Sequence, residues 1–416
     1  MNLDANTSGR LAEAVASSNS KSAAKLPKHA RKAQPGELVG AEIFAGCGGL
    51  ALGMSRAGFK HAVMAEINTP AVETARFNKV RGIEYVAEWP VEKTDVREID
   101  WTAHAGKLAV ISGGPPCQPF GIGGKKNGPK DSRDMWPEAI RAVREARPDG
   151  FLFENVRNLA GPKFRTYLDW ITSSLCRPTL ARASESYLDR LARLHRDEYA
   201  EEYSVAWQVA NAADYGAPQI RFRVIVFGVS LRMSRSAQPM RPTHSRDRLL
   251  WDQYVTGDYW KRHGLERRSE PGDGPDASRV AALRALTRPP PGLPWVTTRD
   301  ALKGLGKPNG RDNHVLQPGA RVYPGHTGSL LDKPAKALKA GDHGVPGGEN
   351  MVVEDNGNVR YFSVREAARL VGLPDDYLFP GSWTESMRQL GNAVPVQLAQ
   401  AAGTWLRRAI VSPKTA

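Results

Sequence analysis

One cysteine lies in a loop whose composition favours reactivity over packing. Cys117 belongs to the loop GPPCQPFG at 114–121, directly after an apolar run at 108–112. Prolines leave this loop little conformational freedom, and open α/β sheets bind ligands in loops that follow the carboxyl ends of parallel strands. An inert buried cysteine is more typical of an apolar strand or helix. The position therefore favours a nucleophile, with a structural cysteine as the alternative.

Two further patterns predict charged side chains near that loop. Glu154 ends the apolar stretch FLFE at 151–154, and an acid at this place can act as a proton donor. Gln219, Arg221 and Arg223 alternate along the chain, so an extended backbone puts them on one face. Two guanidinium groups would give a thiol the positive surroundings that favour its thiolate. Taken singly, each of these residues also fits an ordinary surface charge.

A glycine-rich turn follows the first strand candidate. The sequence FAGCGG at 44–49 separates an apolar run from a helix, and glycines there let the backbone approach a ligand closely. Gly46, Gly48 and Ala51 satisfy the dinucleotide pattern GxGxxG/A, so a nicotinamide cofactor stays open at this point. Glu66 ends the second strand candidate, where a carboxylate can accept both hydroxyls of a ribose. A turn without a ligand and an exposed acid are the alternatives.

Strands that alternate with helices must position these residues. Apolar runs predict strands at 41–44, 61–66, 108–112, 151–154 and 224–229. Helices are predicted at 50–57, from 69, at 136–146 and from 364. Asn68 or Thr69 can cap the second helix, and SVRE at 363–366 is a capping box. The interleaving predicts an α/β fold with a mostly parallel sheet.

Composition and charge narrow the class of protein. The chain has 416 residues, which suits two or three domains. Its 58 Lys and Arg exceed its 44 Asp and Glu, which favours a polyanionic partner such as nucleic acid. The three cysteines stand far apart, which excludes a disulfide framework and a CxxC-type zinc site. No apolar run is long enough to cross a membrane, so we expect no membrane partner.

The composition also changes along the chain and predicts four segments. Residues 1–36 are rich in Ala, Ser and Lys and lack aromatics, which is typical of a disordered basic tail; an organelle transit peptide is the alternative. Residues 37–230 contain most of the predicted strands and helices. Residues 231–350 are dense in Arg, Pro and Gly and hold five of the nine histidines, which predicts a second, smaller, loop-rich domain. Residues 351–416 are ordered again.

In their order, these motifs resemble those of the DNA cytosine-5 methyltransferases. The resemblance covers about residues 38–406, and its departures are small: Glu42 stands where Asp is common, Ser363 replaces Thr and Val371 replaces Gln. The matching motifs are FAGCGG at 44–49, PCQ at 116–118, ENV at 154–156, QIRFR at 219–223, YFSVREAARLVGLPDDY at 361–377 and QLGNAVP at 389–395.

The resemblance implies a fold and a set of site residues. The fold is the Rossmann-like sheet of S-adenosyl-L-methionine-dependent methyltransferases, with the helix that contains Asn392 folded back beside the first strand. The implied catalytic residues are Cys117, Glu154, Arg221 and Arg223. The implied residues of the S-adenosyl-L-methionine site are Phe44, Ala45, Gly46, Cys47, Gly48, Gly49, Leu50, Glu66, Ile67, Asp95, Pro115, Asn392 and Val394, and no metal is implied.

The resemblance also implies an activity. Cys117 would attack C6 of a cytosine flipped out of double-stranded DNA, Glu154 would bind N3, and residues 231–350 would be the target recognition domain. We expect a bacterial, cytoplasmic, monomeric modification enzyme, with a possible cognate restriction endonuclease that acts on the same site without being a physical partner. The alternatives are a cytosine-C5 methyltransferase of transfer RNA and a catalytically silent DNA-binding relative. A nicotinamide oxidoreductase leaves PCQ at 116–118 unexplained.

Overall fold

The computed structural model describes residues 36–116, 133–180, 185–194, 200–233, 237–271, 275–324, 327–341 and 350–411. Two sequence predictions fall outside these ranges. They are the basic tail, apart from its last residue, and the loop position of Cys117.

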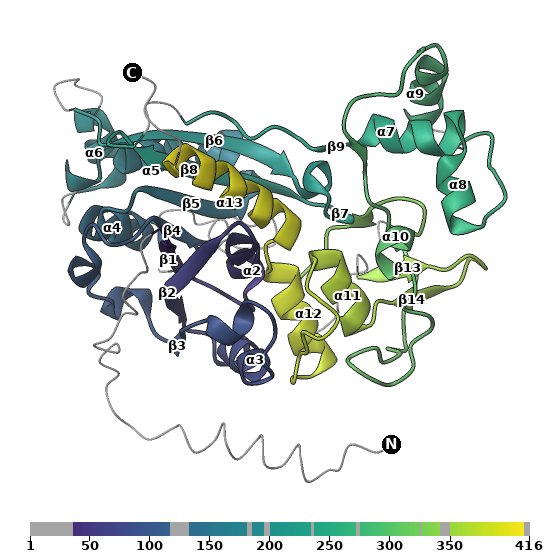
Figure 1. The fold of residues 1–416 in the computed structure, drawn as a ribbon, viewed down its shortest axis with the longest axis horizontal. Helices are drawn as coiled ribbons and strands as arrows, with labels where there is room; N and C mark the ends of the chain where they lie inside the picture. Colours follow the sequence, from purple (N-terminus) through teal and green to yellow (C-terminus); the bar gives the residue numbers. More distant parts are fainter. Residues whose placement is uncertain are drawn as a thin grey trace, which may run out of the picture. The chain divides into compact units, whose positions relative to one another are not determined.

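A seven-stranded sheet forms the centre of the chain, in the order β3-β2-β1-β4-β5-β8-β6. Every neighbouring pair from β3 to β5 is parallel, and β8 pairs antiparallel with both β5 and β6. The mostly parallel α/β sheet predicted from the sequence is confirmed (Figure 1). The strands are β1 Leu38–Ile43, β2 Phe59–Glu66, β3 Val91–Lys93, β4 Val110–Gly113, β5 Gly150–Val156, β6 Tyr203–Asn211 and β8 Phe222–Ser230.

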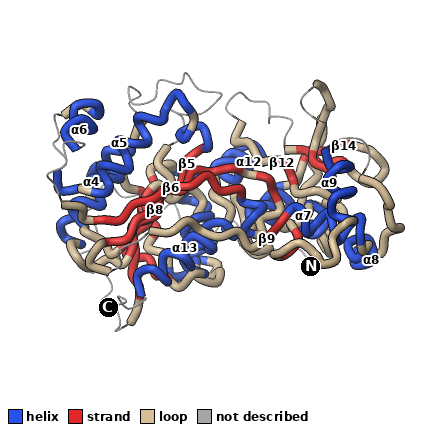
Figure 2. Tube along the Cα trace, turned by 90° about the horizontal axis from the view of Figure 1, so that it is seen from above, coloured by secondary structure: helices blue, strands red, loops and turns tan. Residues whose placement is uncertain are grey.

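Helices cover both faces of this sheet because its central strands are apolar on both sides. In Figure 2, α4 and α5 lie on one side of β5, β6 and β8, and α13 lies on the other. Phe151 and Phe153 of β5 belong to the first side, where Trp136 packs edge-on against Phe153. Leu152 belongs to the opposite side and shares its cluster with residues of α2 and α13. These helices are α2 Gly49–Arg56, α3 Thr69–Val80, α4 Trp136–Ala146, α5 Arg165–Cys176 and α13 Val396–Val411.

Local sequence signals explain where several helices begin. Asn68 caps α3 through a hydrogen bond from the Ala71 amide, with Pro70 in the first turn. Ser363 and Glu366 form the predicted capping box of α11 (Val364–Val371). At the other end of the chain, α13 packs so closely on α2 that a methyl group at Gly53 would lie 2.3 Å from the Ala399 Cβ.

Residues after 231 hold several short helices. They are α7 Arg246–Leu250, the π-helix Trp251–Val255, α8 Asp258–His263, α9 Pro275–Arg284 and α10 Thr298–Leu302. Residues 246–295, which we call the helical lobe, have an apolar cluster of their own around Tyr259 and Trp260. The stem of the lobe is the two-stranded pairing of β9 (His244–Ser245) with β10 (Leu293–Pro294). The segment expected to be rich in loops therefore contains a compact helical part.

Residues 351–411, which we call the carboxyl-terminal return, differ from the expectation that a helix containing Asn392 lies beside the first strand. The helix α12 (Trp383–Asn392) ends at Asn392, and the separate helix α13 packs against α2 and β5. The helix α12 does not continue into α13 because Ala393 is extended, and Pro395 disfavours helical geometry at Val394, the residue before it. A helix that contains Asn392 is thus present, but the helix that packs against α2 and β5 is the next one, α13.

Candidate active site

Most of the predicted site residues follow strands that end at one edge of the sheet. In the parallel registers, Ile43 of β1 is level with Ala65 of β2 and with Gly113 of β4, and Gly113 is level with Phe153 of β5. The glycine loop, Glu66, the start of the cysteine loop and Glu154 therefore meet at this edge. This is the edge where open α/β sheets bind their ligands.

The glycine loop is shaped by left-handed backbone geometry. Phe44, Gly46 and Gly48 have φ values of 56°, 56° and 86°. A side chain at Gly48 would collide with the Trp89 ring, whereas a Cβ at Gly46 would meet no atom within 4 Å. The Trp89 ring therefore packs directly against the loop at Gly48, whereas the space beside Gly46 is open. An open, side-chain-free backbone beside the start of α2 is a suitable place for part of a small ligand.

Glu66 holds the glycine loop and the start of α3 together. Its Oε2 accepts a hydrogen bond from the Gly46 amide and its Oε1 one from the Asn68 amide, both at 2.7 Å. The carboxylate is only half-buried, so each oxygen keeps a lone pair for a hydroxyl group of a ligand. The neighbouring Ile67 is 61% exposed, which leaves an apolar surface on which a flat ring can pack.

Asp95 follows β3 in the chain. It lies near Glu66 because the amide of the preceding residue, Thr94, donates to the Glu66 carbonyl at 3.0 Å. Its carboxylate accepts hydrogen bonds from the Arg97 side chain at 2.5–3.0 Å, which lower the pKa of Asp95. Together, the open loop at Gly46, Glu66, Ile67 and Asp95 fit a ligand with a ribose and an adenine.

Glu154 and Arg223 form an ion pair at the centre of this edge. The Arg223 Nε lies 2.6 Å from the Glu154 Oε1, and both side chains are largely buried. The pair forms because β8 runs antiparallel to β5 and brings Arg223 level with Val156. On its other side, the Glu154 carboxylate faces Gly114, where a Cβ would lie 3.5 Å from Oε2.

Asn155 fixes the beginning of the cysteine loop. Its Nδ2 donates to the Pro115 carbonyl at 3.1 Å, and the amide side chain is fully buried. Pro115 stands two residues before Cys117, so this hydrogen bond holds the loop where it leaves β4, beside Glu154. The sequence singled out the ENV motif, yet it gave no role to its asparagine.

Gln219, Arg221 and Arg223 are on one face, as their alternation predicts, but they bind different partners. Arg221 donates to the carbonyls of Leu338 at 2.9 Å and Gly391 at 2.6 Å, and it is 2% exposed. Gln219 donates to the Leu370 carbonyl at 2.7 Å. Arg221 thus joins the residue position just before β8 to Leu338 and to the helix α12, while Arg223 contacts Glu154. A catalytic role for Arg221 stays a prediction.

The carboxyl-terminal return supports the glycine loop from behind. The Tyr377 hydroxyl donates to the Cys47 carbonyl at 2.7 Å, and the Cys47 Sγ lies 3.8 Å from the Gln389 carbonyl. Val394 approaches so closely that a side chain at Gly49 would lie 2.5 Å from its carbonyl oxygen, whereas Asn392 is exposed. Burial raises the pKa of the Cys47 thiol to about 12, so this cysteine is no nucleophile. Tyr377 lies in a motif the sequence identified, but its contact was not foreseen.

The described part of the chain contains neither a metal-binding cluster nor a membrane-spanning helix. No group of three or more His, Cys, Asp or Glu residues there is arranged to hold a metal ion. No helix there is long and apolar enough to span a membrane.

Comparisons with known proteins indicate the family of this chain. The family model described as C-5 cytosine-specific DNA methylase matches residues 39–177, 188–255 and 315–407. The type II methyltransferase M.NgoMIV of Neisseria gonorrhoeae is 29% identical over 378 residues, which are 90% of this chain and 98% of that protein. M.AplI of Arthrospira platensis is 30% identical over 366 residues, 88% of this chain and 84% of that protein. Among solved structures, the S. pombe Dnmt2 methyltransferase shares the fold, with a TM-score of 0.54 and 16% identity over 90% of this chain and 99% of that one.

Proposed function

The chain belongs to the family of C-5 cytosine-specific DNA methylases, and on this premise we propose that it methylates C5 of cytosine within a specific sequence of double-stranded DNA. The methyl donor is S-adenosyl-L-methionine. The observation that carries the proposal is the Glu154–Arg223 ion pair beside the anchored start of the Cys117 loop. In a restriction-modification system, such an enzyme protects its own DNA from an endonuclease that cuts the same site.

Cys117 supplies the nucleophile of the proposed reaction. Cytosine C5 is a poor nucleophile, and a bond from the Cys117 sulfur to C6 turns the ring into an enamine whose C5 can attack a methyl group. The sulfonium of S-adenosyl-L-methionine supplies that methyl group and leaves as a neutral thioether. A water molecule then takes the C5 proton, and the electron pair of that C–H bond restores the ring double bond and expels the Cys117 thiolate.

Glu154 and Arg223 stabilise the ring while charge develops on it. Glu154 hydrogen-bonds N3 of the cytosine, and Arg223 holds Glu154 in place and binds O2. Asn155 fixes the loop that carries Cys117. Because a stacked base cannot reach this site, the target cytosine must be flipped out of the duplex.

The remaining assignments concern ligand and partner binding. The donor's ribose would bind Glu66, its adenine would pack on Ile67 and bond Asp95, and its methionine part would lie along the glycine loop beside Pro115 and Val394. We propose residues 37–230 and 351–416 as the catalytic domain and residues 231–350 as the target recognition domain. The enzyme would act on DNA as a monomer.

Methyl transfer from labelled S-adenosyl-L-methionine tests the proposal directly. Wild-type protein should label cytosine-containing duplex DNA and not RNA, and Cys117→Ala should label neither. Full activity of Cys117→Ala would refute the covalent mechanism, and preferential labelling of transfer RNA would refute the substrate. Duplexes that carry 5-fluorocytosine at the target position should trap the wild-type chain covalently, because the fluorine cannot leave as a proton does.

A further inference from the structure

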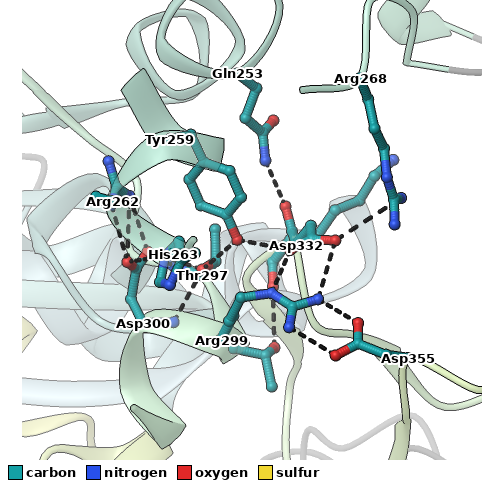
Figure 3. Close-up of polar contacts among 12 residues, drawn as sticks. Gln253, Tyr259, Arg262, His263, Arg268, Thr297, Arg299, Asp300, Asp332 and Asp355 are labelled. Atoms are coloured by element: carbon teal, nitrogen blue, oxygen red, sulfur yellow. Dashed lines mark hydrogen bonds and ion pairs between the residues drawn. The ribbon is translucent and has the colours of Figure 1, made fainter. Parts of the chain in front are cut away.

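A partly buried carboxylate links the helical lobe to the rest of the chain. Asp332 lies in the turn between β11 (Ser329–Leu330) and β12 (Ala335–Lys336). Its side chain accepts hydrogen bonds from the Tyr259 hydroxyl at 2.9 Å and from the Arg299 Nε at 2.6 Å, and Arg268 lies 3.8 Å away (Figure 3). The Asp332 carbonyl accepts from the Gln253 side chain at 2.7 Å. Three of these four partners belong to the lobe.

The residues after Asp332 are held from the opposite side by residues 218–221, which directly precede the strand β8 that carries Arg223. We call residues 332–338 the bridging segment. Within it, β12 pairs with β7 (Gln219–Ile220), and the Ala335 amide bonds the Pro218 carbonyl at 2.9 Å. Arg221 donates to the Leu338 carbonyl at 2.9 Å. Two residues further along, Arg223 contacts Glu154, so the bridging segment lies between the lobe and the catalytic pair.

Hydrogen bonds and ion pairs of the described residues attach the lobe at two places, which are its stem and the bridging segment together with α10, whose Asp300 binds Arg262 and His263. The first is the stem, where the Thr243 amide bonds the Asp214 carbonyl and the Trp295 indole donates to the Asp214 carboxylate, both at 2.9 Å. A body attached only at its stem could rotate about that point. The contacts of Asp332, together with the Lys333–Asp276 ion pair at 2.8 Å, fix the orientation that the stem leaves free.

The chemistry of the second attachment indicates orientation more than stability. Arg299 is largely buried and joins Asp332 to Asp355, and Asp300 binds both Arg262 and His263 (Figure 3). Buried ion networks add little to stability compared with apolar packing of the same volume, but their hydrogen bonds are directional. A network of this kind at a junction therefore suits a part whose angle matters.

We propose that Asp332 is a positioning residue that sets the angle of the helical lobe relative to the Glu154–Arg223 pair, and so determines which base of a bound duplex reaches the catalytic site. The inference rests on the proposed function. If the lobe reads the sequence, its angle fixes the distance between the bases read and the cytosine that is flipped. Loosening the angle should relax sequence specificity while chemistry at Glu154 continues.

Bisulfite sequencing of DNA from cells that express each variant tests this inference. We expect wild-type protein to methylate one sequence context and Asp332→Asn to methylate additional contexts. With purified proteins, the rate ratio between the preferred duplex and duplexes with one changed base pair should fall roughly tenfold in Asp332→Asn, because the discrimination against a changed base pair is partly lost. Tyr259→Phe removes the hydrogen bond to Asp332 and the one to the Thr297 hydroxyl without changing charge, and it should shift the ratio in the same direction by less.

The matched control is Asp247→Asn. It breaks the Arg279–Asp247 pair between α7 and α9, which has the same chemistry within the lobe but does not reach the bridging segment. Its contexts should equal those of wild type. If Asp332→Asn does not fold, Tyr259→Phe decides the question. Wild-type contexts and rate ratios in both folded variants would overturn this inference alone, whereas a wild-type protein that methylates no DNA would overturn the proposed function as well.

Discussion

Glu154 meets its counter-ion across two strands that run in opposite directions. Because β8 alone is reversed in the sheet, Arg223 enters the catalytic edge at the start of its strand while Glu154 stands near the end of β5. The ion pair thus depends on strand direction as much as on the two residue types.

We expect Glu154→Gln to retain the shape of this site and lose its chemistry. The amide cannot supply the charge and proton that the developing ring charge needs, so the turnover rate should fall roughly 10²-fold or more. Binding of S-adenosyl-L-methionine, measured by calorimetry, should stay unchanged because Glu154 is not among the residues proposed for the donor. Equal losses of turnover and donor affinity would contradict this assignment.

The two cysteines of the site should differ in reactivity. Burial raises the pKa of the Cys47 thiol to about 12, so iodoacetamide should spare Cys47 in the native protein and modify it after unfolding in urea. Cys117, as the proposed nucleophile, should be modified in the native state, with parallel loss of methyl transfer. Peptide mass spectrometry distinguishes the two sites. Rapid native alkylation of Cys47 would show that its burial is not maintained in solution.

Motifs predicted the residue types of the site better than their contacts. Alternation correctly placed Gln219, Arg221 and Arg223 on one face, since that follows from strand geometry alone. It did not show that Arg221 binds Leu338 and Gly391, because those carbonyls are more than a hundred residues away. The role of Asn155 was missed because its partner, the Pro115 carbonyl, is 40 residues away and follows a different strand.

At the scale of elements, strand β1 contains a buried acid beneath the glycine loop. Glu42 is fully buried, and the Ser112 hydroxyl of β4 donates to its carboxyl group. Burial raises its pKa from 4.5 to about 8, although the hydrogen bond from Ser112 opposes this shift. The carboxyl group is therefore neutral in the folded chain through neutral pH.

This acid should make stability fall with rising pH. Between about pH 4.5 and 8, Glu42 keeps its proton in the folded chain and loses it on unfolding, so its contribution to the free energy of unfolding decreases across this interval and is constant above it. Glu42→Gln should remove that part of the pH dependence. Urea midpoints of both proteins from pH 5 to 9 measure the difference. Parallel curves for wild type and variant would show that Glu42 is already ionised at neutral pH.

Elements with strong local signals were predictable and the others were not. The strands β1, β2, β4, β5 and β8 contain continuous apolar runs, because helices cover both of their faces. Strand β6 was missed, since it lies at the edge of the sheet and most of its side chains are only partly buried. The division of the carboxyl-terminal return into α12 and α13 was missed as well, although Pro395 marks it.

For the whole molecule, net charge sets the expected partner. The formal charge is +14, and release of counterions from neutralised phosphates should dominate duplex binding. Raising the salt concentration from 50 to 200 mM should lower duplex affinity on the order of 10³-fold. Fluorescence anisotropy with a labelled duplex measures this. An affinity that does not change with salt would contradict a binding surface that contacts several phosphates.

The seating of α13 on α2 has a consequence for synthesis on the ribosome. The Tyr377 hydroxyl donates to the carbonyl of Cys47, which lies 330 residues earlier in the sequence, and Ala399 of α13 packs directly against Gly53 of α2. A nascent polypeptide released as far as β14 (Val359–Tyr361) can pair its strands but leaves one side of α2 uncovered. That surface would stay uncovered until α13 has left the ribosome, and a chain truncated after the helical lobe would lack the contacts that support the glycine loop.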